Sequence, residues 1–299
     1  MSTRVPGVEG VQQETSSVVF VGPSASGKTT SLILLHETCL DYRDDLNMVY
    51  TPNIRTAGFN LYQDTSNLIL QGIPPPPTNP SEKDHRVELT LEFRNFMRRK
   101  VVKLIFADMS GGISSALMKV FPSLATMTPD EVKSKLIDAG LNEEDVDRLV
   151  RSLLSAKGVI LVADASKIGQ AETPDGDLAY YLDNLNQFVK SHGEAPKGVA
   201  LLLTKFDQWR IQMPNPTDEE LRKMVKNFLP QVDNYASNFN RDQKTQYKVF
   251  YSMLNETKDK DGHLKFSIET DNARHMRRVE YSVAQYLDLI KWLKTTFGS

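Results

Sequence analysis

A short stretch near the start of the chain restricts the fold more than any other. Residues 18–21 form an apolar run, Val-Val-Phe-Val, which ends at Gly22. Gly27, Lys28 and Thr29 follow four residues later, and apolar residues then recur at helical spacing. The pattern Gly-x-x-x-x-Gly-Lys-Thr between a strand and a helix is typical of a P-loop, whose backbone N–H groups and helix N-terminus bind phosphate. The sequence therefore predicts a nucleotide phosphate site.

The P-loop chemistry assigns a role to each side chain of the motif. Lys28 is expected to reach the β- and γ-phosphates and to act on the γ-phosphate during hydrolysis, while the Thr29 hydroxyl binds Mg²⁺. The predicted phosphate-binding residues are Ser24, Ala25, Ser26, Gly27, Lys28, Thr29 and Thr30.

The composition is that of an ordinary globular protein. The 299 residues are 40% hydrophobic and 25% charged, with a net charge of −2 and no long basic run, which argues against a nucleic-acid partner. Cys39 is the single cysteine, so no internal disulfide is possible and a reducing, cytoplasmic location is expected. No apolar run approaches the roughly 18 residues of a membrane span. Peripheral membrane association stays open.

Hydrophobic patterning predicts alternating strands and helices along the chain. Residues 86–93 and 101–107 are expected to form an antiparallel hairpin with the first strand at the sheet edge, and 48–56 is interpreted as a loop. Three further apolar strands are predicted at 159–163, 198–203 and 248–251, and helices at 28–40, 59–70, 178–191, 217–239 and 279–296. This order favours an α/β fold, a three-layer, mostly parallel sheet with one antiparallel edge strand.

A second motif, Thr204-Lys205-Phe206-Asp207, comes directly after the predicted strand 198–203. The tetrapeptide resembles the Asn/Thr-Lys-x-Asp guanine motif of the Ras-like and translation-factor-like GTPases. The resemblance implies that a fixed carboxylate at Asp207 accepts from guanine N1–H and its 2-amino group, whereas adenine presents an acceptor at N1 and would leave the carboxylate unpaired. The resemblance implies that Lys205 lies along the guanine base and that Thr204 takes the place of the usual asparagine.

Two further segments carry the same resemblance. Asp108-Met109-Ser110-Gly111 resembles the Asp-x-x-Gly motif, which implies that Asp108 holds Mg²⁺ and that the Gly111 N–H contacts the γ-phosphate. Ser252-Met253-Leu254 resembles the serine-centred loop that contacts the base. The chain thus resembles the P-loop GTPases of the Ras-like (TRAFAC) superfamily, with GTP, GDP and Mg²⁺ as the implied ligands.

Two threonines compete for the Mg²⁺ ligand of the first switch. The segment from Thr56 to Asn60 resembles the switch of ADP-ribosylation-factor GTPases. Thr78 lies nearer the predicted hairpin, at the place where the family carries its threonine, and the run from Gly72 to Thr78 resembles prokaryotic double-GTPase proteins. Features of the beta subunit of the signal-recognition-particle receptor are also implied. Thr78 is favoured and Thr56 stays the alternative.

The resemblance also implies a division of the chain. Residues 1–15 are predicted to be a flexible tail, and 16–255 a GTPase (G) domain that includes a helical insertion at 122–157. Residues 256–299 are predicted to be a C-terminal extension whose closing helix packs on that domain.

One departure from the family affects hydrolysis. Ras-like enzymes place a glutamine after Asp-x-x-Gly to orient the attacking water, and this chain has Gly112 there. We therefore expect a molecular switch with slow or partner-assisted hydrolysis, or alternatively a nucleotide-stabilised scaffold without turnover. A protein effector or regulator is expected at the switch regions and the helical insertion, and a second GTPase or a dimer is another candidate partner. Asp164, which ends a predicted strand, has no motif partner and is interpreted as structural.

Overall fold

The computed structural model describes twelve segments of the chain. They are residues 14–23, 25–50, 58–76, 87–95, 98–106, 126–140, 142–170, 175–192, 196–243, 245–258, 260–271 and 276–298. The predicted tail lies outside them as far as residue 13, whereas its last two residues, Glu14 and Thr15, belong to the first strand.

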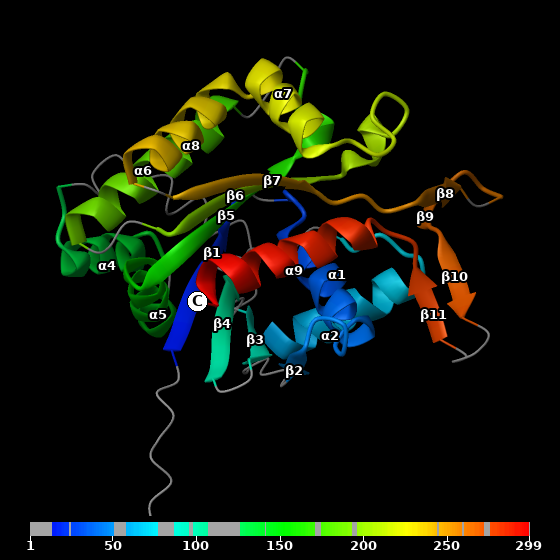
Figure 1. Cartoon of the computed structure of the whole chain (residues 1–299), viewed down its shortest axis with the longest axis horizontal. Coiled ribbons are helices and arrows are strands. Elements are labelled where there is room, and N and C mark those ends of the chain that lie inside the picture. Colours follow the sequence, from blue (N-terminus) through cyan, green and yellow to red (C-terminus); the bar gives the residue numbers. More distant parts are fainter. Residues whose placement is uncertain are drawn as a thin grey trace, which may run out of the picture.

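A seven-stranded sheet forms the centre of the described structure, with the order β2-β3-β4-β1-β5-β6-β7 (Figure 1). Its strands are β1 (Glu14–Val21), β2 (Met48–Tyr50), β3 (Val87–Asn95), β4 (Arg98–Phe106), β5 (Ala156–Asp164), β6 (Gly198–Thr204) and β7 (Gln246–Tyr251). Strands β4, β1, β5, β6 and β7 pair in parallel, and β3 pairs antiparallel with β4. The predicted three-layer, mostly parallel α/β sheet with an antiparallel strand beside β4 is confirmed.

The edge of the sheet differs from the prediction. The short strand β2 pairs antiparallel with β3, Met48 opposite Phe93, so β3 is not the last strand on its side. The interpretation of 48–56 as a loop is therefore wrong for the first three residues. A three-residue strand has too few residues to show an alternating pattern, and its pairing with β3 decides its conformation.

Helices cover both faces of the sheet (Figure 1). One face carries α4 (Pro129–Asp138), α5 (Glu143–Leu154), α6 (Asp175–His192), α7 (Asp218–Phe228) and α8 (Pro230–Gln243). The other carries α1 (Lys28–Asp41), α2 (Gly58–Leu70) and α9 (Val283–Phe297). Alternate residues of β1 supply the two cores, because successive strand side chains point to opposite faces: Val19 joins the first core and Phe20 the second.

Helices α4 and α5 belong to the helical layer of the first face. Leu136 and Val150 are fully buried in the same core as the helices α6 to α8. Strands β4 and β5 both run parallel to β1, so the chain between them has to return along one face of the sheet to the edge where β5 begins. This crossover connection includes α5. The predicted insertion also ends early, because β5 begins at Ala156.

Local signals place several helix ends. Thr128 caps α4 and Thr217 caps α7, each in a reciprocal capping box with the glutamate three residues later. The single helix predicted from 217 to 239 is instead two helices, because α7 ends before Leu229 and α8 starts at Pro230. A proline disfavours the helical conformation of the residue before it, and this explains the break.

The C-terminal part adds two small hairpins and a helix. Strands β8 (Glu256–Lys258) and β9 (Leu264–Phe266) pair antiparallel, as do β10 (Ile268–Asp271) and β11 (Met276–Val279). Helix α9 then packs against the sheet, where the Ser16 hydroxyl donates to the Phe297 carbonyl oxygen at 3.1 Å. None of the helices in the described segments is long and apolar enough to cross a membrane.

Candidate functional site

The P-loop connects β1 to α1 with a backbone that only particular residues allow. A side chain at Gly22 would place its Cβ 2.3 Å from the Val162 carbonyl oxygen of β5. Gly27 has φ +84° and Ala25 has φ +58°, both in the left-handed region. Such turns direct successive backbone N–H groups to one side, where an anion can accept from them. Ser24 lies outside the described residues.

The helix end after this loop is built to accept an anion. Gly27 is the N-cap of α1, it has no side chain to cap the first turn, and that turn holds no acidic residue. The first N–H groups of a helix need acceptors, and the helix dipole favours a negative one. Thr29 and Thr30 lie in this first turn and are half-buried. The loop and helix end therefore fit a phosphate group.

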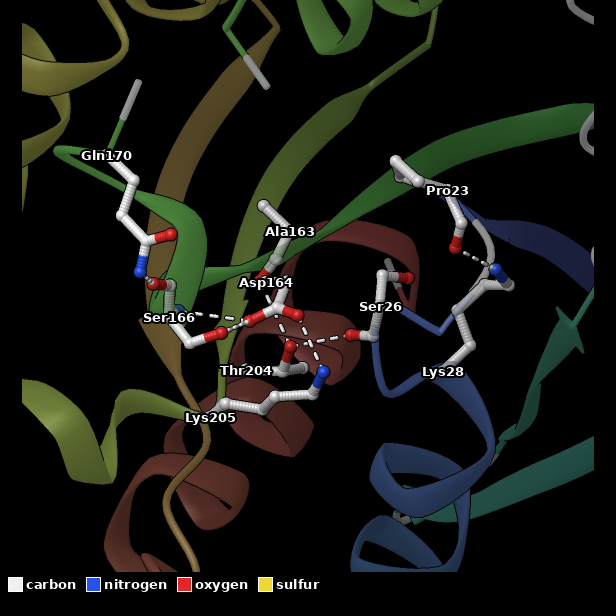
Figure 2. A network of polar contacts seen from close by, with 9 residues as sticks. All are labelled: Pro23, Ser26, Lys28, Ala163, Asp164, Ser166, Gln170, Thr204 and Lys205. Carbon is white, nitrogen blue, oxygen red and sulfur yellow. Dashed lines mark hydrogen bonds and ion pairs between the residues drawn. The ribbon is translucent and has the colours of Figure 1, made fainter. Parts of the chain in front are cut away.

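Lys28 is folded across the loop from which it starts. Its Nζ donates to the carbonyl oxygens of Gly22, at 2.8 Å, and Pro23, at 2.7 Å, and the residue is buried (Figure 2). These two acceptors hold the ammonium group against the loop that connects β1 to α1. The predicted phosphate-binding lysine thus lies in the P-loop with its charge at the site.

Thr204 joins the second motif to the P-loop. It is the last residue of β6, and its Oγ1 lies 2.5 Å from the Ser26 carbonyl oxygen and 3.0 Å from that of Ala163 (Figure 2). The single hydroxyl proton is therefore shared between the P-loop and the end of β5. This contact joins residues 178 positions apart and brings the two motifs together at one edge of the sheet.

The backbone turns at Lys205, and the Lys205 side chain reaches back to β5. Its φ of +51° places it in the left-handed region, and the 3₁₀ helix η3 (Phe206–Trp209) follows. The Lys205 Nζ forms an ion pair at 2.6 Å with Oδ2 of Asp164. The other carboxylate oxygen of Asp164 accepts from the Ser166 backbone N–H at 3.0 Å and from its hydroxyl at 2.5 Å (Figure 2).

This ion pair corrects the interpretation of Asp164. No motif partner is evident for Asp164 in the sequence, yet the structure pairs it with the lysine of the predicted base motif, 41 positions away. No local pattern signals such a contact. The available signal was the position of Asp164 at the end of a strand next to β6, on the edge where ligand groups collect.

Asp207 lies in η3 with a half-buried carboxyl group. Burial is the main cause that raises its pKa above the ordinary value, the nearby Asp164 raises it further, and Lys205 lowers it. Trp209 anchors the same turn, since its indole N–H donates to the Ala165 carbonyl oxygen at 2.9 Å. A partly desolvated carboxylate gains most from a ligand with two adjacent donors.

Ser252 and Met253 follow β7 and are held by the C-terminal segment. The Ser252 hydroxyl is hydrogen-bonded to the Tyr286 hydroxyl at 2.7 Å, and its backbone carbonyl accepts from Phe206 at 3.1 Å. The Met253 backbone N–H donates to the Ser282 hydroxyl at 3.1 Å. Ser252 thus supports the turn that carries Asp207, and the role of both residues as base contacts stays a prediction.

Several predicted site residues cannot be placed. They are Ser24, Thr56, Thr78, Asp108, Gly111 and Gly112, and all lie outside the described residues. Among the predicted Mg²⁺ ligands the structure describes Thr29 alone, in the first turn of α1.

The sheet order and the P-loop at the end of β1 define a P-loop α/β fold, and the predicted base motif begins at the end of β6. No family model and no curated protein matches the chain. Among solved structures, the chain is similar to the signal recognition particle receptor SRb-GTP/SRX complex from Chaetomium thermophilum, at 15% identity over 79% of this chain and 88% of that one, with a TM-score of 0.37.

The GTPase-like domain of Ski7 from S. cerevisiae is a second similar structure. In complexes with GDP and inorganic phosphate or with GTP it is 14% identical over 81% of this chain, with TM-scores of 0.35 and 0.36. This chain spans 43% of the length of those chains.

Proposed function

We propose that this protein binds guanine nucleotides, GTP and GDP with Mg²⁺, and acts as a molecular switch of the small-GTPase type. The contact between Thr204 and the P-loop supports the proposal most, because it joins the predicted phosphate-binding loop to the predicted base motif. A nucleotide has a phosphate end and a base end, and a site for it needs both within one molecule's length. The P-loop fits the first and the turn at Asp207 the second.

The choice of guanine depends on Asp207. Its carboxylate is half-buried, and burial raises its pKa, so the ionised form is disfavoured in the free protein. Two adjacent donors on guanine would compensate for that lost hydration, whereas adenine would bring an acceptor against it. We expect guanine nucleotides to bind at least a hundredfold more tightly than adenine nucleotides, in line with the penalty for an unpaired buried group.

Asp207→Asn tests the assignment. The variant should bind GDP at least tenfold more weakly and gain affinity for xanthosine diphosphate, because an amide can donate to the 2-oxo group of xanthine. Equilibrium titration with fluorescent nucleotide analogues measures both. Equal affinity of the wild-type protein for ADP and GDP would refute the guanine assignment.

The same variant carries its own control for folding. Because the folded-state pKa of Asp207 is raised, the carboxyl group favours the folded state below its ordinary pKa and loses that effect as the pH rises through the raised value. Asparagine does not ionise, so the nucleotide-free variant should be at least as stable as the wild type at pH 7. A weaker GDP complex then reports recognition and not unfolding.

Mg²⁺ belongs to the proposal through its expected ligands. Thr29 would supply one oxygen from the first turn of α1, with Asp108 and Thr78, or alternatively Thr56, as further ligands. Hard oxygen donors of this kind suit Mg²⁺, which retains several waters when it bridges phosphates. Chelation by EDTA should accelerate release of a fluorescent GDP analogue, and Thr29→Val should abolish the difference between release with and without EDTA.

Slow or partner-assisted GTP hydrolysis is part of the proposed switch. Gly112 stands where a water-orienting glutamine is expected, and Gly111 is the proposed γ-phosphate contact. Gly112 also favours a second function, that of a scaffold which holds GTP without turnover. Single-turnover hydrolysis and the nucleotide recovered from purified protein separate the two: GDP supports the switch, and unhydrolysed GTP supports the scaffold.

The proposed partner is a protein that distinguishes the two nucleotide states. Its expected surface includes the switch segments and the exposed sides of α4 and α5, where the described exposed residues include Ile137. A cytoplasmic location goes with this role. Equal affinity of a captured partner for the GDP and GTP forms would contradict the switch.

A further inference from the structure

Asp164 has the geometry of a residue that fixes another side chain. It is the last residue of β5, it is 7% exposed, and both of its carboxylate oxygens have partners. One oxygen accepts two hydrogen bonds from Ser166, and the other forms the ion pair with the Lys205 ammonium group (Figure 2). Since a buried charge must be compensated on every side, these partners hold the carboxylate in one orientation.

The Lys205 side chain is arranged in the opposite way to most surface lysines. A surface lysine usually buries its methylene stem and places the ammonium group in water. Here the ammonium group lies 2.6 Å from a carboxylate that is itself 8% exposed, while the lysine side chain as a whole is 44% exposed. Part of the lysine side chain is therefore open to a ligand while Asp164 holds its charged end. A flat apolar ligand surface could cover the methylene stem without displacing the charge.

The backbone supports the same arrangement. Lys205 adopts a left-handed conformation, which residues with a side chain rarely do, and such strain is found mainly where a site requires it. The neighbouring N–H of Phe206 donates to the Ser252 carbonyl oxygen, and the Thr204 hydroxyl holds the other neighbour against the P-loop. Lys205 is thus fixed from both sides of its backbone and, through Asp164, at its tip.

We propose that Asp164 is a positioning residue for nucleotide binding: by anchoring the Lys205 ammonium group, it holds the lysine stem as a wall against one face of the nucleotide base. The inference rests on the proposed guanine-nucleotide function and adds to it a residue outside both motifs. The base gains from a wall that is already ordered, because no lysine rotamers have to be fixed on binding. Base selectivity stays with Asp207, which faces the edge of the base.

The experiment uses Asp164→Asn, Lys205→Met and the double variant in the full chain. Asparagine keeps an oxygen for Ser166 but cannot pair with the ammonium group, and methionine keeps an unbranched apolar side chain without a charge. We expect GDP to bind about tenfold more weakly to each single variant, mainly through faster release. The double variant should be no weaker than Lys205→Met alone, because Asp164 acts through Lys205.

The base selectivity of the variants distinguishes a residue that positions Lys205 from one that contacts the base directly. Inosine diphosphate lacks the 2-amino group, so the ratio of GDP to inosine diphosphate affinity should stay at its wild-type value in Asp164→Asn and fall in Asp207→Asn. Ser166→Ala is the matched control, because it removes a hydrogen bond to the same carboxylate and leaves the ion pair intact. It should bind GDP within twofold of the wild type.

The outcomes distinguish the two proposals. Wild-type protein that binds no guanine nucleotide refutes the proposed function. If wild-type protein binds GDP but Asp164→Asn binds it equally well, or if the two single variants have additive effects, the positioning role of Asp164 is refuted. Should Asp164→Asn fail to fold, Lys205→Met still decides, since the Lys205 side chain is not buried and GDP affinity equal to the wild type would overturn the proposal.

Discussion

Thr204→Val removes one hydroxyl group from the junction of the two motifs. The hydroxyl is buried, with the residue 3% exposed, and it lies within hydrogen-bond distance of the Ser26 and Ala163 carbonyl oxygens. A net hydrogen bond is worth about 1 kcal/mol, and a buried acceptor left without its donor costs about 1–3 kcal/mol. We therefore expect the free energy of unfolding to fall by about 2 kcal/mol.

The assay is equilibrium denaturation of the nucleotide-free protein in urea, followed by thermal unfolding. At about 2–4 °C per kcal/mol for a chain of this size class, the melting temperature should fall by about 6 °C. Thr204→Ser is the matched control, since it keeps the hydroxyl and should lose less than half as much stability. Because nucleotide stabilises the folded state by mass action, the comparison must be made in its absence.

Nucleotide affinity gives the second measurement on the same variants. The hydrogen bond from the Thr204 hydroxyl to the Ser26 carbonyl oxygen fixes the P-loop against the end of β6. Loss of this bond should weaken GDP binding about tenfold in Thr204→Val, whereas Thr204→Ser keeps a hydroxyl and should lose less than threefold. A Thr204→Val protein that equals the wild type in both stability and GDP affinity would show that the hydroxyl does not join the motifs, and the reasoning would be refuted.

Two further predictions concern groups away from the site. Burial raises the pKa of the Cys39 thiol to about 12, so a thiol reagent at pH 8 should label native protein only as fast as the chain unfolds; rapid labelling of folded protein would contradict this. The Thr217 backbone N–H lowers the pKa of Glu220, so this group stabilises the fold above its ordinary pKa and ceases to do so as the pH falls through the lowered value. Carboxyl NMR titration should show a partial rise of the Glu220 pKa in Thr217→Ala, which removes the hydroxyl donor and keeps the backbone N–H. An unaltered titration would exclude the Thr217 hydroxyl as a cause of the lowered pKa.

The sequence predicts the parts of the fold that local chemistry determines. The P-loop combines a close approach of Gly22 to β5, a left-handed Gly27 and a lysine, and each requirement selects a residue type. The capping boxes at Thr128 and Thr217 are equally local, because each pairs a threonine with the glutamate three residues later. The strand–helix alternation follows from apolar periodicity, so the α/β class could be predicted without tertiary information.

Features that depend on distant residues could not be predicted in the same way. Strand β2 exists because β3 offers it a partner, and the ion pair of Asp164 with Lys205 requires that β5 and β6 be neighbours. Neither leaves a pattern in its own segment. The break at Pro230 is different, because proline gave a usable local signal that the single-helix prediction overlooked.

The packing of α9 has a consequence for the order in which the chain can fold. The ring of Phe297 occupies space that Cβ atoms at Gly158 and Gly198 would need, with separations of 2.2 and 2.9 Å, and the Phe297 carbonyl accepts from Ser16 on β1. Strand β1 emerges first during synthesis, yet this end of the sheet stays uncovered until residue 297 has been made. A chain on the ribosome therefore exposes apolar strand surface until α9 has been made. The docking of α9 joins residues 281 positions apart, and a closure over this separation favours slow folding.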